Sequence, residues 1–103
     1  DRLVVGLVAG RSAPNRVLIA ALLEYAAGAL TSVGDDESAA RLVGAAQALR
    51  PTAERDPLGL AGPSVERLGS TSFELAVVEG AELDRTAAID LALERLAMVR
   101  SAG

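Results

Sequence analysis

The sequence predicts an all-α fold of antiparallel helix hairpins, with about five or six helices. Three observations support this. Half of the 103 residues are hydrophobic, and they are mainly Ala, Leu and Val with a single Phe and a single Tyr, a profile that suits close-packed helices better than a β-sandwich. Apolar residues recur at helical spacing along most of the chain. No segment has an evident partner with which it could pair as a strand.

The first two predicted helices cover residues 1–10 and 12–33. The first segment is ambiguous between strand and helix, and we expect a short helix because a lone strand would lack a partner. In the second segment, Ser12 suits an N-cap and Pro14 is tolerated in the first turn. One stripe at helical spacing runs along this helix: Leu18, Leu22, Tyr25, Ala29 and Val33.

A third helix, the second of the hairpin, is predicted after a very short link. Gly34 is placed to end the preceding helix, Asp35 or Asp36 to cap the next one, and Pro51 to end it. Its predicted buried face consists of Ala39, Leu42, Val43, Ala46 and Leu49. Because the link is only about three residues long, the two helices should return antiparallel as a hairpin over residues 12–51.

Residues 63–103 are predicted to form the closing helices. Pro63 suits the start of a short helix, and Gly69 ends it. Thr71 and Glu74 have the spacing of a capping box for the next helix. The predicted buried stripe of that helix is Phe73, Ala76 and Val77.

The last helix is expected over residues 85–101. Gly80 is placed to end the helix before it, and Asp84 to cap its first turn. Its predicted buried stripe is Ala88, Ile89, Ala92, Leu93 and Leu96. Residues 1–103 are expected to form a single helical domain.

Composition excludes several classes of chemistry. The chain has no His and no Cys, so the usual zinc sites, thiol nucleophiles and Ser-His-Asp triads are excluded. All ten basic residues are Arg, so lysine Schiff-base chemistry is excluded too. We therefore expect no enzyme activity, no catalytic residues, no cofactor and no bound metal.

Charge and hydropathy restrict the partners. The net charge is −4 and the Arg residues are scattered among carboxylates, which argues against direct binding to nucleic acid. The uncharged stretches are at most about ten residues, whereas a membrane span needs roughly 18, so no membrane partner is expected. The lack of cysteine and of a signal peptide agrees with a cytoplasmic protein.

Two local features could be read as sites. The acidic run at Asp35, Asp36 and Glu37 could bind a divalent cation, but helix capping and an outer i,i+4 pair of Glu37 with Arg41 explain it more simply. Tyr25, inside an apolar helix, suggests core or groove lining. A groove for a partner or an apolar ligand would then be lined by Leu18, Leu22, Tyr25 and Ala29.

The hairpin over residues 12–51 resembles a tetratricopeptide repeat. With Gly34 as the turn, large or apolar residues fall at Leu23, Leu30 and Val43, and Pro51 closes the pattern. Small residues fall where two helices must approach closely: Ala27, Ala39 and Ala46. An ordinary Ala-rich helix pair is the alternative interpretation.

Two longer strings are similar to the closing helical region of large bacterial signal-transducing ATPases of the LuxR-type and cyclase-linked regulator families. They are residues 34–50 (GDDESAARLVGAAQALR) and 73–93 (FELAVVEGAELDRTAAIDLAL). Val77 stands where that family often has Trp, and Asp84 replaces a capping Ser or Thr. The family's phosphate-binding loop and helix-turn-helix have no counterpart here. The resemblance therefore implies no ATPase or DNA-binding activity for this chain.

The resemblance implies a non-catalytic module for protein interaction and signal relay in a bacterial regulator. Arg in place of Lys, with abundant Ala, Gly and Val, is typical of GC-rich genomes such as those of actinobacteria. The chain begins at Asp1, and we expect it to be cut from a longer polypeptide. Its partner would be the rest of that polypeptide or a second copy, because residues 17–23 are apolar on every side of a helix. The alternative is a sensor for a small apolar effector.

Overall fold

The computed structural model describes residues 2–10, 16–50 and 62–102. Every regular element within these ranges is a helix, which confirms the all-α prediction and the helix predicted at the start of the chain. The six described helices are α1 (Arg2–Gly10), α2 (Arg16–Ser32), α3 (Asp36–Leu49), α4 (Gly62–Leu68), α5 (Ser70–Ala81) and α6 (Arg85–Ala102).

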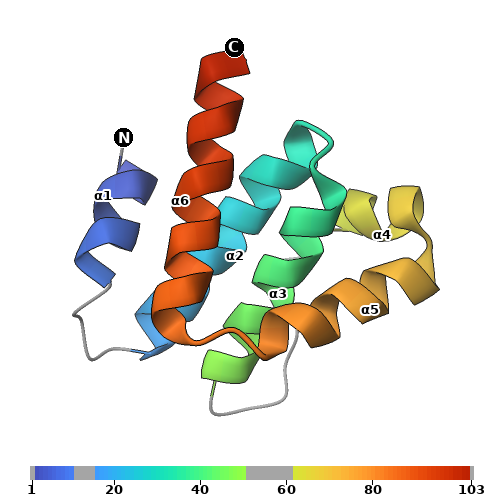
Figure 1. Ribbon diagram of the computed structural model, residues 1–103, viewed down its shortest axis with the longest axis horizontal. Helices are drawn as coiled ribbons and strands as arrows, with labels where there is room; N and C mark the ends of the chain where they lie inside the picture. Colours follow the sequence, from blue (N-terminus) through green and yellow to red (C-terminus); the bar gives the residue numbers. More distant parts are fainter. Residues whose placement is uncertain (1, 11–15, 51–61, 103) are drawn as a thin grey trace.

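The hairpin of α2 and α3 forms the centre of the molecule (Figure 1). Helix α5 crosses α3, and α6 packs against both α2 and α3. Helix α1 lies on one side, against α2 and α6, whereas α4 and α5 lie on the other side, against α3. No helix among the described residues combines the length and the apolar character needed to cross a membrane.

The reversal between α2 and α3 depends on Gly34. Its φ of 84° lies in the left-handed region, which glycine adopts without steric penalty. The backbone N–H of Gly34 donates to the Thr31 carbonyl at 3.2 Å, and that of Asp35 donates to the Leu30 carbonyl at 2.9 Å. The predicted turn is confirmed, and α2 ends one residue earlier than expected. Ser12, Pro14 and Pro51 lie outside the described residues.

The core is made largely of Ala, Leu and Val side chains from α2, α3, α5 and α6. The stripe predicted for α5 is buried, whereas Leu49 in α3 and Leu93 in α6 are only half-buried. The buried members of the predicted stripes are Ala39, Leu42, Val43, Ala46, Phe73, Ala76, Val77, Ala88, Ile89, Ala92 and Leu96. Apolar residues at helical spacing therefore mark the core face of α3, α5 and α6.

Glycine sets the close crossing of α3 and α5. A Cβ atom at Gly44 would lie 1.9 Å from the Val77 carbonyl oxygen, and one at Gly80 would lie 1.8 Å from the Arg41 carbonyl oxygen. The prediction that Gly80 ends its helix is wrong, because α5 continues to Ala81. Gly80 occurs here because the backbone of α3 occupies the space that a side chain would need.

The predicted helix caps have mixed outcomes. Asp84 caps α6 as expected, since its Oδ1 accepts a hydrogen bond of 2.7 Å from the Ala87 backbone N–H. Thr71 is not an N-cap, because α5 already begins at Ser70 after Gly69, whose φ is 85°. Asp35 occupies the N-cap position of α3, but its side chain makes no capping hydrogen bond.

Candidate functional site

The four residues predicted to line a groove share one face of α2. Leu18 and Tyr25 are each 52% exposed, whereas Leu22 and Ala29 are half-buried. Helix α1 covers this face in part, because a Cβ atom at Gly6 would lie 3.2 Å from Leu22 Cδ2. The side of α2 that enters the core carries a different set of residues: Ile19, Ala20, Leu23, Ala26, Ala27 and Leu30. We call the first set the outer face of α2.

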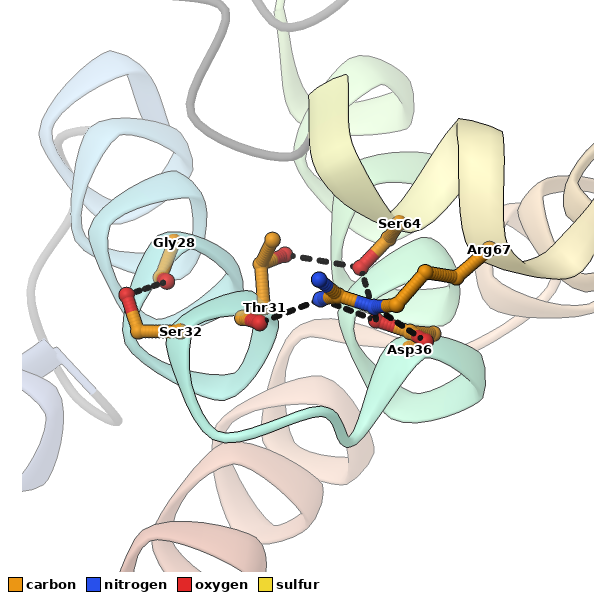
Figure 2. Close-up of polar contacts among 6 residues, drawn as sticks. All are labelled: Gly28, Thr31, Ser32, Asp36, Ser64 and Arg67. Atoms are coloured by element: carbon orange, nitrogen blue, oxygen red, sulfur yellow. Dashed lines mark hydrogen bonds and ion pairs between the residues drawn. The ribbon is translucent and has the colours of Figure 1, made fainter.

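A cluster of polar side chains joins α4 to the turn between α2 and α3 (Figure 2). The Ser64 hydroxyl donates to Asp36 Oδ1 at 2.6 Å and lies 3.0 Å from the Thr31 hydroxyl. Because the only hydroxyl hydrogen of Ser64 goes to Asp36, Thr31 must donate to Ser64. Arg67 donates from Nε to Asp36 Oδ2 at 2.9 Å and from Nη2 to Oδ1 at 2.7 Å.

The same arginine also closes the end of a helix. Arg67 Nη2 donates to the Thr31 carbonyl in the last turn of α2, which also accepts the Gly34 backbone N–H. A guanidinium there also complements the negative end of the helix dipole. The hydrogen bonds from Arg67 lower the pKa of Asp36 below its ordinary value of 3.8; partial burial opposes this shift, and Ser64 adds to it.

This cluster links α4 to the turn between α2 and α3 through hydrogen bonds among its own side chains. Ser64 is fully buried and its hydroxyl is engaged on both sides. Asp35 makes the equivalent link to another helix, since Arg95 Nε of α6 donates to its Oδ2 at 2.7 Å. Asp35 therefore holds the predicted N-cap position of α3, but its side chain and that of Asp36 bind arginines on distant helices.

The acidic run at the start of α3 is neutralised by arginines. Glu37 pairs with Arg41 one turn later, as predicted, and Arg41 also lies 3.9 Å from Glu79 of α5. In the described parts of the chain, no three carboxylates come together in a way that could hold a metal ion.

Acid should weaken the link through Asp36. Its lowered pKa means that ionised Asp36 stabilises the fold, and this contribution is lost as the pH falls through the folded-state pKa. We expect the free energy of unfolding, measured by urea titration, to fall below about pH 4. The Asp36→Asn variant should be less stable at neutral pH and should lose less stability on acidification.

A matched control for this titration is Glu37→Gln, which removes an exposed carboxylate one residue away. Its pair with Arg41 is on the surface, so little stability depends on it. Parallel loss of stability in Asp36→Asn and the unmodified chain below about pH 4 would contradict the assignment to Asp36.

One buried ion pair, Glu24 with Arg50, was not among the predicted features. Glu24, in the middle of α2, is 1% exposed, and Arg50, directly after α3, binds it through two nitrogens, with Nε 3.3 Å from Oε2. The signal that could have revealed it is a single carboxylate within the otherwise uncharged run of residues 17–34, with an Arg directly after the second helix of the hairpin.

The outward surface of α5 is the second exposed apolar region. Leu75 and Val78 are 62% and 58% exposed, on the side of α5 opposite its buried stripe. A hollow of about 330 Å³ beside them is lined by Ser70, Thr71, Glu74, Leu75 and Val78. A second hollow, of about 290 Å³, is lined by Glu37, Leu68, Ser72, Leu75, Ala76 and Glu79. We call this surface the outer face of α5.

Comparison of the chain with protein families, curated proteins and solved structures finds no match.

Proposed function

We propose that this chain is a non-catalytic helical module of a bacterial regulatory protein, which carries protein–protein contacts and relays them to the rest of its polypeptide. The supporting observation is the exposure of large apolar side chains on the outer faces of α2 and α5: Leu75 and Val78 lie one helical turn apart, and Leu18 and Tyr25 lie two turns apart on one face. Single exposed apolar residues are ordinary, but neighbouring ones on a helix face are typical of contact surfaces. The exposed large apolar residues on α1, α2 and α5 are Val5, Val8, Val17, Leu18, Tyr25, Leu75 and Val78.

The charge supports a protein partner rather than a nucleic acid. The chain carries a net charge of −4. Four of its Arg side chains, Arg41, Arg50, Arg67 and Arg95, already bind carboxylates of the same chain. A phosphate backbone would require clustered basic side chains that are available for contact.

The turn between α2 and α3 supports a role in relaying contacts, because it is linked to two other helices. Asp36 links this turn to α4, and Asp35 links it to α6. A partner that displaces α4 would therefore act on the same short segment that holds α6. The tetratricopeptide-like hairpin seen in the sequence agrees with such a role, since helix pairs of this kind bury one another's faces.

Binding of a small apolar effector near Tyr25 is the alternative function. A sensor would need to enclose its ligand on most sides. Tyr25 is half-exposed on the outer face of α2. That position favours contact with a protein surface over a ligand cavity, so the interaction module is the stronger proposal.

Self-association through the outer face of α2 tests the proposed function. In a concentration series by sedimentation equilibrium, we expect the average mass of the whole chain to rise. The paired substitutions Leu18→Glu and Tyr25→Glu should return it to the monomer mass, because they place charge on an apolar contact. Met98→Glu, on an equally exposed apolar residue of α6, is the matched control and should still associate.

A chain that stays monomeric at every concentration, and that retains no peptide from a displayed library of random sequences, would contradict an interaction function. Retained peptides whose binding is lost in the Leu18→Glu, Tyr25→Glu variant would support the function without self-association.

A further inference from the structure

The outer face of α5 has the residue spacing of a helix-binding surface. Leu75 and Val78 lie one turn apart, and Thr71 precedes Leu75 by one turn on the same face. Leu75 lines both hollows, so it stands as a ridge between them. Two hollows on either side of an apolar ridge can receive apolar side chains that a second helix presents at intervals of three and four residues.

The rim of this surface is acidic. Glu74 lines the first hollow, and Glu37 and Glu79 line the second, whereas neither lining includes a basic residue. Arg41 of α3 pairs with Glu37, and its Nη2 lies 3.9 Å from Glu79 Oε2. The three carboxylates outnumber the single Arg41 beside them, so the rim stays negative and favours a partner that brings positive charge beside its own apolar residues.

This charge pattern discriminates among occupants. A second copy docked through α5 would bring the carboxylates of both copies together, and like charges across a contact are repulsive. The phosphates of nucleic acids and the head groups of anionic lipids would be repelled for the same reason. The described part of the chain contains only helices, so it offers no sheet edge to which an extended peptide could be added.

We propose that the outer face of α5 binds an amphipathic helix of a partner protein in which an apolar stripe is flanked by Arg or Lys. This inference rests on the proposed interaction function and specifies its surface and the chemistry of its partner. The apolar stripe would cover Leu75 and Val78, and the basic side chains would reach Glu74 on one side and Glu37 and Glu79 on the other.

Synthetic peptides of about 15 residues, long enough for four helical turns, provide the probe. One carries Leu at intervals of three and four with Arg beside that stripe. A second replaces each Arg with Glu, and a third has the composition of the first in scrambled order. Fluorescence anisotropy on the whole chain should show binding of the Arg peptide alone, with an affinity that falls as salt screens the rim.

Two variants test the surface directly. Leu75→Asp together with Val78→Asp should weaken binding of the Arg peptide by roughly tenfold or more, because both apolar contacts are lost. Leu18→Asp, an exposed apolar residue on the outer face of α2, is the matched control and should leave binding unchanged. Circular dichroism checks that each variant keeps its helices.

Reversal of the rim charge gives the sharpest test of the partner's chemistry. Glu74→Arg together with Glu79→Arg reverses the charge of one rim carboxylate beside each hollow without altering Leu75. We expect the preference to shift from the Arg peptide towards the Glu peptide. Equal binding of the ordered and scrambled Arg peptides, or unchanged binding in Leu75→Asp, Val78→Asp, would overturn the inference.

Failure of this inference is distinguishable from failure of the proposed function. If Leu18→Asp rather than the α5 variant abolishes peptide binding, the chain remains an interaction module and α5 is the wrong surface. If no peptide binds, the α5 assignment is wrong, while sedimentation decides separately whether the outer face of α2 associates.

Discussion

Replacing Gly44 with Ala is expected to lower the free energy of unfolding by about 3 kcal/mol or more. The new Cβ atom would lie 1.9 Å from the Val77 carbonyl oxygen, about 1.4 Å short of an ordinary C···O contact. The obstacle is backbone, so no side chain can rotate away, and α3 and α5 must separate along their crossing. The gain in helix propensity from Gly to Ala, about 1 kcal/mol, offsets only part of this loss.

Gly80→Ala should have a similar effect, because its Cβ atom would lie 1.8 Å from the Arg41 carbonyl oxygen at the same crossing. The two losses should not add. Once one methyl group has pushed the helices apart, the second meets less resistance, so the double variant should lose clearly less than the sum. Thermal melts followed by circular dichroism should show each single variant at least about 10 °C lower.

Gly62→Ala is the matched control for this series. It places the same methyl group at a helical glycine where a Cβ atom has nothing within 4 Å, so its melting temperature should stay close to that of the unmodified chain. If the melting temperature of Gly44→Ala were the same as that of Gly62→Ala, the close crossing of α3 and α5 would be incorrect.

The sequence was informative where structure depends on local chemistry. The apolar spacing of α3, α5 and α6 identified their buried faces, because a helix that packs on one side repeats its apolar residues every three or four positions. Gly34 and Asp84 acted as predicted because a left-handed turn and an N-cap each depend on one residue and its immediate neighbours.

The sequence was misleading where a residue's role depends on a distant helix. Gly80 has the pattern of a helix stop, but the backbone of α3, which lies against it, determines its role. Asp35 and Asp36 have the pattern of caps, but Arg95 and Arg67 bind them across 60 and 31 residues of chain. The groove predicted along Leu18 and Tyr25 stays a prediction; both side chains are exposed on a face of α2 that α1 covers in part.

The second large effect is expected at the ion pair of Glu24 and Arg50. Glu24 is 1% exposed, so Arg50→Met would leave a carboxylate buried without the guanidinium that binds it. Removing one partner of a buried pair destabilises proteins by about 3–5 kcal/mol. We expect a loss of that size in urea denaturation at neutral pH, together with a marked fall in melting temperature.

The reciprocal variant, Glu24→Met, should be less harmful. The Arg50 side chain is 15% exposed and lies after the last turn of α3, so its long stem can carry the guanidinium to water. The double variant, with Met at both positions, should recover most of the stability lost in Arg50→Met, because an apolar pair of similar volume needs no compensating charge. A small loss in Arg50→Met, or a double variant as unstable as Arg50→Met, would show that Glu24 does not depend on Arg50. The carboxylate would then have to reach water by another route, and the contact between α2 and the end of α3 would be looser than the structure has it.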